Sequence, residues 1–132
     1  MTKTIKIFTS LLLVLLVFGY LNFFSNIVFP WQQAEAIKTT LDWGGLANLP
    51  KKAENIKVEK SGGMFNRTFI IEFNANKKEI EKWILYSKRL KDNKPKVKGI
   101  NETYEIYPGE NESLGGKVNV EKGKVTIRMS WS

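Results

Sequence analysis

The chain has 132 residues, a net charge of +8, no cysteine and no histidine. It therefore has no disulfide, thiolate zinc ligand or thiol nucleophile, and it lacks the commonest general base and transition-metal ligand. An enzyme built from this chain would depend on Asp, Glu, Lys, Tyr or Ser. The composition favours a non-enzymatic protein, and we predict no catalytic, cofactor-binding or metal-ligating residues.

Residues 7–29 are almost continuously apolar and follow Lys3 and Lys6. A helix rises about 1.5 Å per residue, so this run is long enough to cross a hydrocarbon core of about 30 Å. Trp31 follows at the expected membrane boundary, and the leading lysines favour a cytoplasmic amino terminus. We therefore predict that residues 1–31 are a single-pass membrane anchor or uncleaved signal, with the remaining domain outside the cytoplasm.

A cleaved signal peptide is the alternative interpretation of the same run. Ala34-Glu35-Ala36 fits the small-residue pattern before a cleavage site, and cleavage near Ala36 would release a secreted or periplasmic domain. The strongly apolar part ends near Leu21, which leaves an unusually long stretch before Ala36. This length favours the anchor, and both interpretations place the domain outside the cytoplasm.

Residues 32–54 are expected to form a juxtamembrane linker, because Gly44, Gly45 and Pro50 interrupt regular structure. Trp43 and the neighbouring apolar side chains are expected to cover one edge of the domain. The alternative is that they rest on the lipid interface near the anchor.

Apolar and polar side chains alternate on both sides of Gly62-Gly63, which is typical of two half-buried strands in a hairpin. A two-residue loop would pair Ile56 with Phe69 and Val58 with Arg67. Paired residues share a face of the sheet, so Arg67 does not fit the otherwise apolar face. It is expected either to lie at the margin of the sheet or to extend its stem past the core.

Residues 77–91 are predicted to form a helix that is capped by Asn74 or Asn76. One stripe at helical spacing is expected to pack on the apolar face of the preceding hairpin, and it consists of Ile80, Trp83, Ile84, Ser87 and Leu90. Residues 92–99 have the composition of a loop. Residues 100–107 are predicted to form the next strand.

The carboxyl-terminal residues alternate strictly around Lys122-Gly123, which has the sequence of a two-residue turn. In the resulting hairpin, apolar side chains oppose one another and opposite charges meet. The predicted pairs are Glu121 with Lys124, Val120 with Val125, Val118 with Ile127 and Leu114 with Trp131.

These elements together predict an α+β protein. An N-terminal transmembrane helix precedes a small domain, residues 55–132, of order β-β-α-β-β-β. The sheet is expected to be mostly antiparallel, with one helix packed on one face.

Basic residues are concentrated between positions 77 and 98. A basic residue near an anionic lipid surface contributes about 1 kcal/mol to binding. The candidate anionic-surface site consists of Lys78, Lys82, Lys88, Arg89, Lys91, Lys94, Lys96 and Lys98. The alternative is a solvated face that keeps the domain soluble. Nucleic-acid binding is disfavoured, because aromatic residues do not interleave with these lysines and no reader motif is present.

We expect a membrane-anchored extracytoplasmic protein with a non-enzymatic binding or accessory role. Its expected partner is another protein of the envelope, held at the open face of the sheet or at an edge strand. The first alternative is a binder of lipid head groups or cell-wall polyanions that acts through the basic stretch. The second is an enzyme that uses carboxylates and tyrosines. No cofactor is expected, and the sequence does not decide the oligomeric state.

Overall fold

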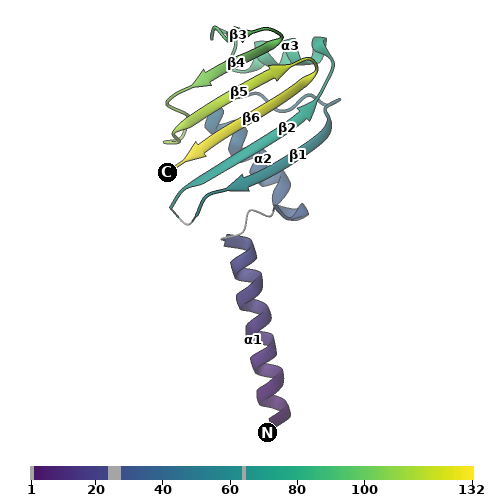
Figure 1. The fold of residues 1–132 in the computed structure, drawn as a ribbon, viewed down its shortest axis with the longest axis vertical. Coiled ribbons are helices and arrows are strands. Elements are labelled where there is room, and N and C mark those ends of the chain that lie inside the picture. The colour runs from purple at the N-terminus through teal and green to yellow at the C-terminus, as the bar shows by residue number, and fades with distance from the viewer. Residues whose placement is uncertain (1, 24–27, 64) are drawn as a thin grey trace.

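The computed structural model describes residues 2–23, 28–63 and 65–132. Helix α1 (Thr2–Phe23) extends away from a domain in which helices α2 (Pro30–Gly44) and α3 (Lys77–Tyr86) lie on one face of a six-stranded sheet (Figure 1). The α+β class is confirmed. The predicted element order is wrong, because the domain contains an additional helix and an additional strand.

All neighbouring strands of the sheet are antiparallel, and their order across it is β1-β2-β6-β5-β4-β3. The carboxyl-terminal strand therefore lies in the middle of the sheet, between β2 and β5. The strands are β1 (Glu54–Ser61), β2 (Arg67–Asn74), β3 (Lys96–Lys98), β4 (Asn101–Ile106), β5 (Gly115–Glu121) and β6 (Lys124–Trp131).

Helix α1 is long and apolar enough to cross a membrane over Thr2–Leu21, and this segment is exposed along its whole length. A signal sequence would have the same length and composition. Residues 24–27, near the end of the predicted apolar run, lie outside the described residues. The structure thus contains a candidate anchor or signal helix where the sequence predicts one.

Helix α2 occupies residues that the sequence predicted to be an irregular linker, and that prediction is wrong for them. Pro30 lies in the first turn, where its missing N–H is not needed, and Gly45 ends the helix in a left-handed conformation with φ 59°. The two glycines therefore terminate a helix rather than prevent one. Its buried side faces the sheet and consists of Ala36, Thr40, Leu41 and Gly44.

Strand β3 lies within the segment that was predicted to be a loop. It pairs with β4 through a short connection in which Gly99 has a φ of 64°. The strand has only three residues, all of them exposed, so it buries no apolar face that a sequence pattern would reveal. Pairing with β4 alone accounts for its formation.

The predicted register of the first hairpin is wrong. Val58 pairs with Ile71 rather than with Arg67, and Lys60 pairs with Phe69. The connection between the strands runs from Gly62 to Asn66 and is longer than two glycines. From Lys57 onward the register differs from the predicted one by an even number of residues, so these side chains keep their predicted faces, and Lys60 lies among the apolar residues.

The predicted carboxyl-terminal hairpin is confirmed. Lys122 and Gly123 both have positive φ, 40° and 82°, as a type I′ turn requires. The ladder ends at Gly115 and Ser130, so the predicted pair of Leu114 and Trp131 lies just beyond it. The three inner pairs form as predicted, namely Glu121 with Lys124, Val120 with Val125 and Val118 with Ile127.

Helix α3 begins as predicted, since the Asn76 Oδ1 accepts the Glu79 N–H at 2.8 Å. It ends at Tyr86, earlier than predicted, and three residues later the Arg89 N–H donates to the Gly45 carbonyl at 3.2 Å. The Ser87 hydroxyl donates to the Trp83 carbonyl at 2.8 Å and accepts the Ala47 N–H at 3.0 Å. The indole of Trp83 donates to the Ala47 carbonyl at 3.0 Å, so both residues attach the α2–β1 connection to α3.

The two helices divide the apolar face of the sheet between them, where a single helix was predicted. The ring of Trp83 on α3 packs edge-on against Phe73 at 5.5 Å, and Trp43 on α2 packs against Phe69 at 5.6 Å. The buried centre consists of Ile71, Phe73, Ile106, Val118, Val125, Ile127 and Met129, together with Leu41, Ile80, Trp83, Leu90 and Tyr104. The Trp43 end of this face is less completely filled, and a cavity remains there.

Ser87→Ala is expected to lower the free energy of unfolding by about 1–3 kcal/mol, because it leaves the Ala47 N–H without its hydrogen-bond acceptor. Chemical unfolding of the full-length chain in micelles, followed by tryptophan fluorescence, measures this change. Ser132→Ala, at the exposed carboxyl terminus, is the control and should have no effect. Equal midpoints for the two variants would contradict the role assigned to Ser87.

Candidate functional site

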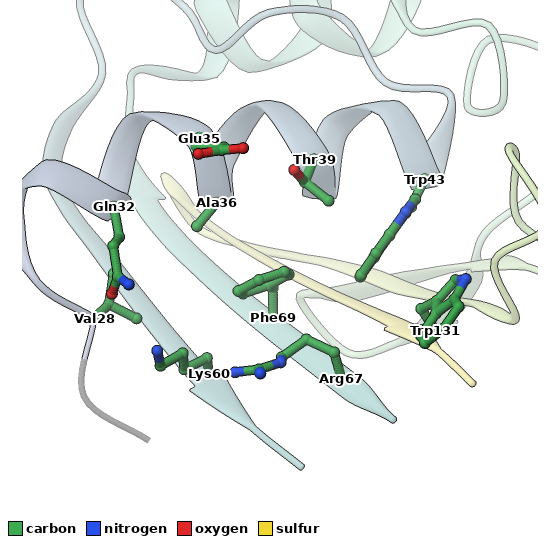
Figure 2. A pocket seen from close by; sticks show the side chains of 10 residues that line it. All are labelled: Val28, Gln32, Glu35, Ala36, Thr39, Trp43, Lys60, Arg67, Phe69 and Trp131. Atoms are coloured by element: carbon green, nitrogen blue, oxygen red, sulfur yellow. The ribbon is translucent and has the colours of Figure 1, made fainter. Parts of the chain in front are cut away.

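A cavity of about 370 Å³ lies between helix α2 and the end of the sheet where β1 turns into β2 (Figure 2). Helix α2 forms one wall, and strands β1, β2 and β6 form the other. Its lining combines basic, acidic, amide, hydroxyl, aromatic and aliphatic side chains, which are Val28, Gln32, Glu35, Ala36, Thr39, Trp43, Lys60, Arg67, Phe69 and Trp131.

The register of β1, β2 and β6 places two basic residues on the wall of this cavity. Lys60 pairs with Phe69, and Arg67 lies two residues before Phe69 on the same face of β2. Arg67 pairs in turn with Trp131 at the end of β6. In Figure 2 the Arg67 guanidinium extends toward the stem of Lys60 beneath the helix, and the Lys60 ammonium points onward toward Gln32.

The electrostatics of this basic pair are unusual for a small domain. Lys60 is only 6% exposed. Its burial, and secondarily the charge of Arg67, lower the pKa of the Lys60 ammonium. Both effects disfavour the charged form, because a buried cation loses its hydration and a neighbouring cation repels it. An anion bound between the two groups would reverse both effects.

The remaining walls are mostly apolar. Trp43 and Phe69 are in ring contact at 5.6 Å, and the partly exposed Trp131 continues this surface toward the solvent. Gln32 points from α2 toward Lys60, whereas the exposed Glu35 carboxylate lies across the helix from the basic pair in Figure 2. The cavity is therefore amphipathic, with a cationic end and an aromatic side.

Several residues of the predicted basic site are held in ion pairs. Lys88 and Arg89 both lie beside Glu110, at 3.6 and 3.3 Å, and Lys96 lies 3.2 Å from Glu105. The hydrogen bond from Arg89 and the charge of Lys88 lower the pKa of the Glu110 carboxyl. These contacts attach the turns after α3 to the loop before β5 and the edge of the sheet.

The structure does not gather the predicted basic site on one surface. Lys78 and Lys82 are exposed on α3, which covers one face of the sheet. Lys96 and Lys98 pair with Thr103 and Asn101 on the opposite face. The remaining exposed members of the stretch are Lys91 and Lys94, in the segment between α3 and β3.

Helix α3 and strand β3 also lie at the end of the domain that points away from α1 (Figure 1). A basic surface at this end faces away from any bilayer that holds α1. Binding of a polyanion by this stretch stays a prediction, and its geometry favours a polymer at a distance from the membrane over lipid head groups.

Lys60 and Arg67 are not among the site residues that the sequence predicts. The sequence contains part of the pattern that points to these two residues. Arg67 does not fit the apolar face predicted for its strand, and Lys60 continues the alternation of Ile56 and Val58. Two basic residues at the ends of two apolar strand faces are an unusual pattern. Bringing them into one cavity requires the actual hairpin register and the position of α2, which the sequence did not predict.

Comparison of this chain with protein-family models, with curated proteins and with solved structures finds no match. Within residues 2–23, 28–63 and 65–132, the acidic side chains form no group of three or more that could hold a metal ion. The cavity beneath α2 is therefore the feature from which a function can be inferred.

Proposed function

We propose that the protein is a membrane-anchored, extracytoplasmic binding protein whose domain binds an anionic amphiphile. Such a molecule has a carboxylate or phosphate head group and an apolar tail. The observation that carries the proposal is the placement of Lys60 and Arg67 together in a cavity whose other walls are largely aromatic and aliphatic. Binding, rather than catalysis, is the role proposed for this site.

The head group would lie between the Lys60 ammonium and the Arg67 guanidinium. Hydrogen bonds between charged groups are stronger than neutral ones, and the planar guanidinium matches the two oxygens of a carboxylate or phosphate. The tail would lie against Phe69, Trp43 and Trp131. A volume of about 370 Å³ is within the range of small-molecule sites and accommodates a head group and part of a chain.

The anchor supports this choice of ligand. An amphiphile is concentrated in and near a membrane, and the cavity lies at the end of the domain that is nearer to α1 (Figure 1). Lys3 and Lys6 before the apolar helix favour a cytoplasmic amino terminus, so the domain would act on the opposite side of the membrane.

A protein partner is the second candidate function. Four large apolar side chains are between 66% and 71% exposed on α3 and around β3, namely Leu85, Tyr86, Val97 and Ile100. Exposed apolar surface of this kind favours contact with another protein. Cross-linking of the membrane-embedded protein in cells tests this role, which is compatible with ligand binding at the other end of the domain.

The ligand proposal is tested with full-length protein in phosphatidylcholine nanodiscs. Energy transfer from tryptophan to a dansyl-labelled fatty acid reports binding, and empty nanodiscs provide the background. We expect Lys60→Met combined with Arg67→Gln to weaken binding at least about tenfold, since each lost hydrogen bond to a charged group contributes about 1.5–3 kcal/mol. Unlabelled fatty acid and lysophosphatidic acid, as competitors, distinguish a carboxylate from a phosphate ligand.

The matched control is Lys57→Met combined with Arg128→Gln. Both residues are exposed on the opposite face of the sheet, and the pair changes the net charge by the same amount. The control should bind the probe as the wild type does. Equal weakening in both double variants, or equal competition by a zwitterionic lysolipid of the same chain length, would refute the proposal.

A further inference from the structure

The connection between β1 and β2 presents Phe65 almost completely to solvent. Phe65 is 83% exposed, more than any large apolar residue among residues 2–21 of α1, the most exposed of which is Ile7 at 70%. A phenylalanine at this position contributes nothing to the buried core, which on this hairpin begins at Ile71. Exposed apolar groups of this size commonly mark a contact surface.

Asn66, the residue after Phe65, contacts the two glycines at the start of this connection. Gly62 has a φ of 101°, and a Cβ there would lie against the Asn66 carbonyl oxygen, so the position requires glycine. The Asn66 side chain accepts the Gly63 N–H at 2.8 Å. These contacts hold Asn66, beside the exposed Phe65, against the end of β1.

The position of the loop indicates its partner. The turn between β1 and β2 lies at the end of the domain that is nearest to the carboxyl end of α1 (Figure 1). Only residues 24–29 separate α1 from α2, and six residues span at most about 20 Å. The domain is therefore confined close to whatever surface α1 occupies.

Trp31 gives a second, independent indication of the membrane level. Its ring stacks on Phe29 at 4.6 Å and on Phe18 at 6.3 Å. Phe18 belongs to the last turn of the segment that is long enough to span a membrane. Trp31 is therefore placed at the boundary of the span, where tryptophan is typically found.

We propose that Phe65 inserts into the lipid interface and docks the α1-proximal end of the domain on the bilayer. This inference rests on the anchoring part of the proposed function. Arg67 follows two residues later, beside head groups that attract basic residues. Docking in this orientation brings the cavity beneath α2 to head-group level, so an amphiphile would enter from the membrane rather than from the aqueous phase.

The chain lacks cysteine, so single cysteines can be labelled without background. Full-length protein carrying Phe65→Cys, Leu15→Cys or Ile100→Cys is labelled with a nitroxide and reconstituted in phosphatidylcholine nanodiscs. Accessibility to oxygen and to a water-soluble nickel chelate then reports the depth of each label. Leu15 marks the predicted span, and the exposed Ile100 marks the far end of the domain.

We expect the label at position 65 to be shielded from nickel at least about threefold more than the label at position 100, and less than the label at position 15. If the labels at positions 65 and 100 are equally accessible to nickel while the label at position 15 is shielded, the docking inference is wrong and the membrane anchor still holds. If the label at position 15 is also accessible to nickel, both the docking inference and the membrane anchor are wrong. Repeating the measurement with Lys60→Met and Arg67→Gln separates docking from ligand binding, because docking should persist in that background.

Discussion

Gly116→Ala is expected to lower the free energy of unfolding by about 3 kcal/mol or more, a large effect for a single added methyl group. Gly116 lies on the buried face of β5, between Ile106 on β4 and Met129 on β6. A Cβ at this position would overlap the carbonyl oxygen of Arg128. Backbone atoms in the middle of a sheet cannot rotate away as a side chain can, so the strands would have to separate.

The expected size exceeds the usual range for an overfilled core, about 1–3 kcal/mol, because the clash is with backbone. Small domains are stable by about 5–15 kcal/mol, so this variant would be partly unfolded near physiological temperature. Urea unfolding in micelles, followed by the fluorescence of Trp43 and Trp83, provides the measurement.

Gly63→Ala is the matched control for this variant. The nearest atom to a Cβ at Gly63 is 3.9 Å away, which is ordinary contact, and its φ is not positive. The control should change stability by less than about 0.5 kcal/mol. A loss for Gly116→Ala as small as that for Gly63→Ala would mean that β5 and β6 can separate at little cost.

Lys60→Met is expected to raise the free energy of unfolding at pH 7 by about 0.5–2 kcal/mol while weakening ligand binding. Methionine has a similar length and shape, so the buried stem is kept, whereas the buried ammonium beside Arg67 is removed. Opposite changes in stability and binding are typical of a residue that serves a binding site.

The difference in the free energy of unfolding between Lys60→Met and the wild type should depend on pH, and this dependence tests its electrostatic cause. A lysine whose pKa is lowered by folding binds fewer protons in the folded chain than in the unfolded chain. The stability of the wild type therefore rises with pH between the lowered pKa and the ordinary value of 10.5. The advantage of Lys60→Met should accordingly shrink across this window as the wild-type ammonium loses its charge.

Tyr104 also titrates at alkaline pH, since burial and the charge of Glu102 raise its pKa. Tyr104 is present in the wild type and in Lys60→Met, so its contribution cancels from the difference between their free energies of unfolding. Lys57→Met, an exposed residue on the same strand, provides the control and should show a small difference that does not change with pH. A stability advantage of Lys60→Met that persists unchanged above pH 10.5 would contradict an electrostatic origin.

The sequence by itself determined the elements that depend on neighbouring residues. The apolar run of α1 can be predicted without knowing what it contacts. The hairpin at Lys122-Gly123 can also be predicted locally, because its turn residues and the alternation of its strands indicate the same pairing. The start of α3 at Asn76 and the buried stripe of this helix follow equally from capping and helical periodicity.

Only the tertiary structure decided the features that depend on distant segments. The buried side of α2 is short and interrupted by polar residues, so the sequence pattern does not reveal the helix. Its packing against the sheet, including the contact of Trp43 with Phe69, is visible only in the tertiary structure. The register of β1 on β2 is determined by a loop longer than its two glycines and by the pairing of β2 with β6. The cavity requires the position of α2 and the register of β1 on β2, because only together do they place Lys60 and Arg67 in one cavity.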